Sequence, residues 1–84
     1  MKFTVVALES VDATLATLYY EAADPQTITD AANWMERELK TDPLTKVSPI
    51  DNLYYLRRDS LVALCEISVP DRIVKIVEIH RIDE

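Results

Sequence analysis

Residues 61–82 read LVALCEISVPDRIVKIVEIHRI, two apolar runs that meet at the turn-forming residues VPDR, 69–72. The runs at 61–69 and 72–82 are rich in Val, Ile and Leu, a composition that favours β-strands. Between them, the proline presets φ for the first central position of a type I turn. The segment therefore predicts two long strands that pair antiparallel across a tight turn.

A two-residue turn in this hairpin sets its register. Glu66 then lies opposite Lys75, and this cross-strand pair explains a carboxylate in the middle of an apolar strand. The same register places Leu61 opposite His80 and puts Glu66 on the other face of the sheet from His80. Glu78 is two residues from His80 and shares its face, because side chains alternate along a strand.

The remaining strands are expected earlier in the chain. Residues 53–57 form a third β-type run, and residues 2–8 form a short one at the N-terminus. Residues 41–51 contain two prolines, two aspartates and a serine, which is the composition of a loop. The sequence thus predicts four strands, three of them consecutive at the end of the chain.

Two segments between the first and second of these strands have helical spacing. Residues 11–23 are expected to form a helix with Ser10 as its N-cap. Asp24 is a favoured cap for a second helix at 26–39, and Pro25 is tolerated at its first position. The expected buried residues are Val11, Leu15, Leu18, Tyr19 and Ala22 in the first helix, and Ile28, Ala31, Ala32, Met35 and Leu39 in the second.

The expected fold is α+β, in the order strand, helix, helix, strand, strand, strand. The helical hairpin packs on one face of a mostly antiparallel four-stranded sheet, and the other face stays partly open. A length of 84 residues is expected to form one domain, residues 1–84.

The composition argues against several classes of function. Fifteen acidic against nine basic residues give a net charge of −6, and this field repels a phosphate backbone. Glycine is absent, which removes the glycine-rich loops that hold nucleotide phosphates, so no cofactor is expected. No metal site is predicted either, and the lone Cys65 in its apolar run is expected in the core.

The location of the protein is predicted from its apolar segments. None of them approaches the roughly 18 residues that cross a bilayer. The N-terminal run reaches Glu9 too soon for a secretion signal, so a cytoplasmic protein is expected.

Three segments carry a resemblance to a known family: MKFTVV at 1–6, DPQTITDAA at 24–32, and PDRIVKIV at 70–77 with His80 and Arg81 after it. They resemble the RelE/ParE superfamily of type II toxin–antitoxin and plasmid-stabilisation toxins, with the same order of elements. The resemblance implies a small toxin that a cognate antitoxin wraps and neutralises. It leaves the target open, because this fold serves ribosome-dependent mRNA cleavage and, in the ParE branch, inhibition of DNA gyrase.

The cleavage branch requires a base, an acid and a cation that stabilises the charged transition state. His80 lies near the position where ribonuclease members of the superfamily place a catalytic histidine or tyrosine. Arg81 or Arg57 would hold the phosphate. Each has a plainer reading: a lone histidine near a strand end is often half-exposed and inert, and Arg57 and Arg58 can equally mark a solvated strand end.

The chain departs from the ribonuclease members in ways that weaken this reading. Those members look strongly basic, whereas this chain is acidic and residues 59–61 contain no arginine. A ParE-like inhibitor needs only a protein-binding surface. The candidate partner-binding residues are Tyr54, Arg58 and Trp34, because aromatic side chains are favoured at interfaces. Tyr54 and Tyr55 alternate faces, so one of them should point away from the helices. The alternative is that Trp34 and Tyr55 only fill space at the edge of the core.

The sequence therefore predicts a toxin-like component that acts by binding proteins, namely a cognate antitoxin and, as target, DNA gyrase. One alternative is a ribosome-dependent mRNA interferase. Another is a degenerate, non-toxic family member that binds only a partner or a second copy of itself.

Overall fold

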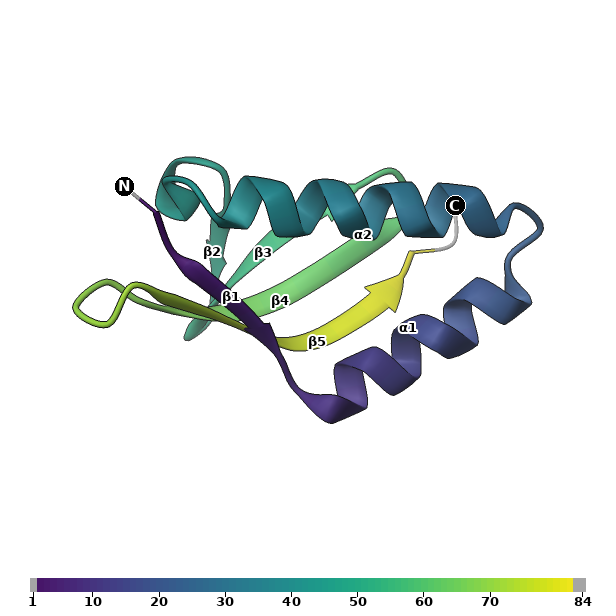
Figure 1. The fold of residues 1–84 in the computed structure, drawn as a ribbon, viewed down its shortest axis with the longest axis horizontal. Helices are drawn as coiled ribbons and strands as arrows, with labels where there is room; N and C mark the ends of the chain where they lie inside the picture. The colour runs from purple at the N-terminus through teal and green to yellow at the C-terminus, as the bar shows by residue number, and fades with distance from the viewer. Residues whose placement is uncertain (1, 83–84) are drawn as a thin grey trace.

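The computed structural model describes residues 2–82, which form two helices and a five-stranded sheet (Figure 1). The elements in chain order are β1 (Thr4–Ala7), α1 (Glu9–Glu21), α2 (Pro25–Leu39), the short 3₁₀ helix η1 (Pro43–Thr45), β2 (Ser48–Ile50), β3 (Leu53–Arg58), β4 (Leu61–Ser68) and β5 (Ile73–Arg81). The strand order is β1-β5-β4-β3-β2, with β1 parallel to β5 and every other pair antiparallel. The predicted α+β class and order of elements are confirmed.

The sheet has one strand more than the sequence predicts. β2 lies within the segment 41–51, whose composition predicts a loop, and it pairs with β3 from Ser48 opposite Tyr55 to Ile50 opposite Leu53. Pro49 has no N–H to donate, but β2 is an edge strand that pairs with β3 alone, so a residue without a donor is tolerated there. The segment predicted as a loop therefore also contains a short edge strand.

The β4–β5 hairpin contains the predicted turn and the predicted charge pair. The Arg72 N–H donates to the Val69 carbonyl at 3.2 Å, which closes the turn. Glu66 lies opposite Lys75, and its Oε2 is 3.8 Å from the lysine Nζ.

The predicted register continues through Cys65 and Ile76 and is wrong beyond them, because β5 contains a bulge at Val77. Cys65 lies opposite Ile76 whereas Leu64 lies opposite Glu78, so one residue of β5 has no partner. His80 consequently lies opposite Val62 rather than Leu61. The extra residue also changes the phase of β5, so that Glu66 and His80 lie on the same face of the sheet, not on opposite faces.

Helix α1 starts earlier than predicted, and Ser10 is not its N-cap. Leu8 holds that position with extended backbone, and no side chain caps the helix. The chain turns here because the Leu8 N–H still donates to Ile76 of β5 at 3.1 Å while its carbonyl accepts from Val11 at 2.9 Å. α1 also ends at Glu21 rather than at residue 23, and Tyr19, expected in the core, is 43% exposed.

Helix α2 follows the prediction closely. Asp24 caps it, because one carboxylate oxygen accepts from the Gln26 N–H at 3.2 Å and the other from the Thr27 hydroxyl at 2.9 Å. Pro25 is the first helical residue. Four residues of the predicted stripe are buried: Ile28, Ala31, Met35 and Leu39.

The core lies between the two helices and one face of the sheet, which we call the helix face. Its central residues are Val11 of α1, Ala31, Met35 and Leu39 of α2, Leu56 of β3, Leu61, Ala63 and Cys65 of β4, and Val74 and Ile79 of β5. The other face, which carries Val62, Leu64 and Glu66 of β4, we call the open face. The helices diverge from their short connection, so α1 and α2 form a V over the sheet (Figure 1). Among the described residues, neither helix combines the length and apolar character that a membrane crossing requires.

Candidate functional site

Two of the predicted catalytic residues lie in one row across the open face. Arg57 of β3 and His80 of β5 are both in register with Val62 of the strand between them. Neighbouring strands are about 4.8 Å apart, so the two Cα atoms are separated by about 10 Å. Both side chains project from the same face, and Val62 between them is buried.

The next row of the open face adds a carboxylate and a phenol. Tyr55, Leu64 and Glu78 are in register across β3, β4 and β5. The Glu78 Oε1 is 3.9 Å from the His80 Nδ1, so these side chains are neighbours, as the sequence predicts. Tyr55 is therefore the tyrosine of β3 that points away from the helices, which the alternation of side chains predicts for one of Tyr54 and Tyr55 but cannot assign.

Arg81 lies on the helix face, away from His80 and Arg57. It is in register with Leu61 and, across that residue, with Arg58. Glu66 shares the open face with His80, but it lies four positions along β4 from Val62, a distance of about 13 Å. The open face thus brings together His80, Arg57 and Glu78 and leaves Arg81 and Glu66 apart from them.

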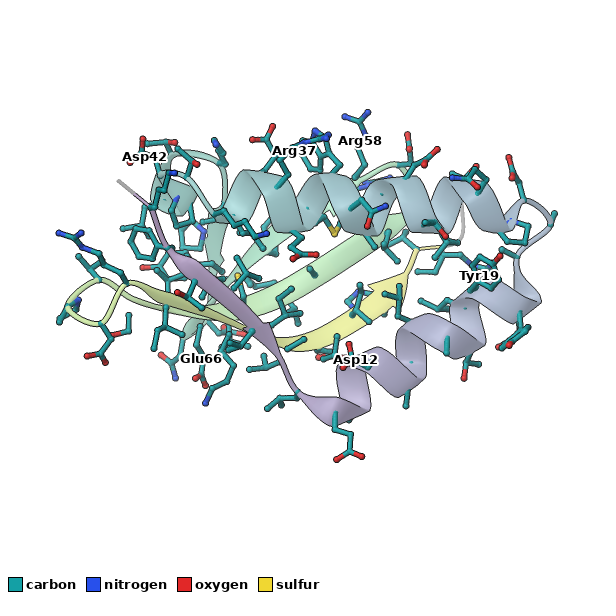
Figure 2. The ribbon with its side chains drawn as sticks, viewed as in Figure 1. Asp12, Tyr19, Arg37, Asp42, Arg58 and Glu66 are labelled. Carbon is teal, nitrogen blue, oxygen red and sulfur yellow. The ribbon has the colours of Figure 1, made fainter. Side chains whose placement is uncertain are left out.

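The predicted partner-binding residues gather on the helix face beside α2. The Arg58 guanidinium carbon is 4.8 Å from the centre of the Trp34 ring, a cation–π contact between β3 and α2. Figure 2 shows Arg58 beside α2. Tyr54 is half-buried and packs against the core. Arg58 and Trp34 therefore join β3 to α2, and Tyr54 contributes to the core.

A groove separates the two helices. Its inner part, about 330 Å³, is bounded by both helices, by β1, and by residues of the helix face such as Ala63, Ile76 and Ile79. Its outer part, about 320 Å³, lies between the helices alone and reaches Tyr19. The two parts share Asp12, Leu15, Ala32 and Asn33 and are continuous; we call them the interhelical groove.

Neither cysteine nor metal chemistry has a site in the described part of the chain. Cys65 is fully buried, and burial raises the pKa of its thiol from 9.0 to about 11, which keeps it protonated and unreactive near neutral pH. Within residues 2–82, no three His, Cys, Asp or Glu side chains come together as a metal site requires.

The mixed sheet with a helical hairpin on one face is the RelE/ParE fold that the sequence predicts. No family model matches the chain, and no curated protein is significantly similar to it in sequence. The likeness to solved structures is clear and extends over nearly the whole chain.

Three of these structures come from toxin–antitoxin systems. A chain of the toxin–antitoxin complex RelBE2 from Mycobacterium tuberculosis superimposes with a TM-score of 0.81 at 18% identity, covering 96% of this chain and 92% of that one. A chain of the chromosomal ParDE system from P. aeruginosa gives a TM-score of 0.72 at 13% identity, covering 98% of both chains. A chain of the archaeal RelE–RelB complex from Pyrococcus horikoshii OT3 gives 0.66 at 16% identity, covering 96% of both.

Proposed function

We propose that this chain is the toxin-like component of a type II toxin–antitoxin system and acts by binding proteins. The observation that carries the proposal is the likeness over at least 96% of the chain to structures from the RelBE2 and ParDE systems. On this proposal the chain forms a complex with a cognate antitoxin, and DNA gyrase is the first target to test. We place this action in the cytoplasm, where gyrase and ribosomes lie.

The charges of the chain favour binding over RNA cleavage. A net charge of −6 opposes the approach of a phosphate backbone, which a nuclease of this size must attract. The three predicted catalytic residues also lie on two faces of the sheet, since Arg81 is on the helix face. A protein-binding surface requires neither a positive field nor a catalytic triad.

The test combines a partner and a target. The small open reading frame next to this gene should encode a protein that copurifies with the chain and restores growth when both are expressed. The purified chain should inhibit supercoiling of plasmid DNA by gyrase, and the copurifying protein should relieve that inhibition. A chain that neither arrests growth nor binds its neighbour's product would be the degenerate, non-toxic member of the superfamily.

A ribosome-dependent mRNA interferase is the second candidate, and one observation favours it. The row of Arg57, Val62 and His80 places a cation and an imidazole on the same exposed face, with Glu78 beside the imidazole. An imidazole near a carboxylate can act as an acid or base, and loss of such a group costs about 10²–10⁴ in rate. If this candidate is correct, His80→Ala and Arg57→Ala each abolish cleavage of mRNA on translating ribosomes, whereas Arg72→Ala in the β4–β5 turn leaves it unchanged.

A further inference from the structure

The acidic charge of the chain is concentrated in its helices. Residues 9–40 carry seven Asp and Glu side chains against two basic ones, a formal charge of −5 in a chain of −6. α1 contains Glu9, Asp12 and Glu21 and has no lysine or arginine. Because the interhelical groove lies between α1 and α2, anything that enters it enters a negative field.

The lining of the groove is apolar except at a few points. Val11, Leu15 and Ile79 are among the apolar residues that line its inner part. Asp12 and Glu36 are the charged residues of that lining, and among the described residues no lysine or arginine lines either part. The groove can therefore bind the apolar side chains of a ligand, and the only charges in its lining are negative.

Asp12 is the more informative of these two carboxylates. It lies on the side of α1 that faces α2, as does Tyr19 (Figure 2), and it lines both parts of the groove. Within residues 2–82 its carboxylate has no ion-pair or hydrogen-bond partner, whereas Glu36 has an exposed contact with Lys40 at 3.3 Å. A cation bound in the groove would find an unneutralised partner at Asp12.

We propose that the interhelical groove docks a cationic amphipathic segment of a protein partner. The apolar side chains of that segment contact Leu15 and Ala32, and its lysine or arginine side chains lie beside Asp12 and Glu36. The inference rests on the proposed function in one respect, that the chain acts by binding a protein; the segment then belongs to the antitoxin. A second copy of this chain fits less well, because its helices carry the same sign of charge and like charges across an interface repel.

Synthetic peptides test the charge preference directly. A fluorescent peptide made of leucine and lysine in a helical amphipathic pattern should bind the full chain, and its leucine–glutamate counterpart should not. Binding of the lysine peptide should weaken steeply as salt rises from about 0.05 to 0.5 M, because screening shortens the range of charge interactions. Equal binding of both peptides, or binding of neither, would overturn the proposal.

Matched variants locate the binding surface. The double variant Asp12→Lys/Glu36→Lys should weaken binding of the lysine peptide by about tenfold or more, since two favourable charge contacts become repulsive. The control Glu21→Lys/Asp30→Lys changes the net charge equally on the same two helices but outside the groove lining, and it should bind within about twofold of the wild type. Equal losses in the two double variants would show a non-specific charge effect and contradict the proposal.

Two further measurements separate loss of binding from misfolding and from self-association. If the charge-reversed protein does not fold, the neutral pair Asp12→Asn/Glu36→Gln replaces it, because it preserves side-chain shape. Its affinity for the lysine peptide should fall by less than the loss of about tenfold expected for the charge-reversed pair. Analytical ultracentrifugation that shows a wild-type dimer, and a monomer for the charge-reversed pair, would assign the groove to a second copy and overturn the proposal.

Failure of this inference can be distinguished from failure of the proposed function. If the neighbouring gene product binds the chain and its affinity is the same for the wild type and for Asp12→Lys/Glu36→Lys, the toxin–antitoxin proposal stands and the groove is not the docking site. If that affinity falls about tenfold with the charge reversal and not with the control pair, the groove inference is supported.

Discussion

At the scale of single residues, the chain has no glycine, so other residue types adopt the left-handed backbone conformation in its turns. Asp42, Asp51, Asp59 and Arg72 all have positive φ, between 46° and 54°. Aspartate tolerates this left-handed region comparatively well, but arginine has no side-chain feature that offsets the clash of its Cβ. Arg72 is thus the residue of the β4–β5 turn whose backbone conformation glycine would adopt more easily.

Arg72→Gly should therefore stabilise the protein by about 0.5–1 kcal/mol. Removing the Cβ relieves strain in the folded state, and the greater conformational entropy of glycine in the unfolded chain offsets part of this gain. Urea denaturation measures this as a higher midpoint at unchanged slope. The control Arg72→Ala keeps the Cβ and should bring no stabilisation. A lower midpoint for the glycine variant would contradict the assigned turn geometry.

Cys65 should make stability depend on pH in the alkaline range. Burial raises the pKa of its thiol from 9.0 to about 11, so the folded state keeps the proton that the unfolded state loses above pH 9. The contribution of the protonated thiol to the free energy of unfolding is fully present below pH 9. It is lost as pH rises toward 11, at up to about 1.4 kcal/mol per pH unit. The slope of unfolding free energy against pH should be shallower in Cys65→Ala than in the wild type; equal slopes would contradict this.

At the scale of elements, the bulge in β5 decides which side chains meet. It leaves Val77 without a partner while Ile76 and Glu78 pair with consecutive residues of β4. Bulges of this kind re-aim the side chains that follow them. The sequence predicts the pairing of Glu66 with Lys75 next to the turn, but no residue type or spacing near Val77 indicates the bulge. This is why the predicted face of His80 relative to Glu66 is wrong.

Deleting Val77 should consequently leave the hairpin intact. Glu78 and His80 would keep their partners Leu64 and Val62, because removal of the unpaired residue restores a regular ladder. We expect a loss of about 1–2 kcal/mol in the free energy of unfolding. Deleting Ala63, which is fully buried and paired on both sides, should instead prevent stable folding, since it turns part of β4 over. Equal damage from the two deletions would rule out the bulge.

The two helices show how far local signals reach. Asp24 and Pro25 form a self-contained cap, so the start of α2 is predictable from the sequence. The start of α1 is set by the hydrogen bond from Leu8 to Ile76, a contact between residues far apart in the chain. Ser10 has the right chemistry for a cap, but it lies two residues after the N-cap position, inside the first turn of the helix.

At the scale of the whole molecule, the order of elements and the amphipathic helices predict the fold, and the comparisons with solved structures confirm it. The site is less accessible to such reasoning. The sequence names His80, Arg57 and Arg81 together, whereas the register places Arg81 on the other face of the sheet. The interhelical groove has no sequence motif at all, because it arises from the angle between α1 and α2.

The central claim is that the chain acts by binding proteins rather than by cutting RNA. The growth rate of cells after induction of the double variant Arg57→Ala/His80→Ala tests it most directly, with the wild type and an empty vector induced in parallel. We predict that the double variant arrests growth as strongly as the wild type, and that the neighbouring gene's product restores growth in both cases. A wild type that arrests growth beside a double variant that grows like the empty vector would contradict the claim.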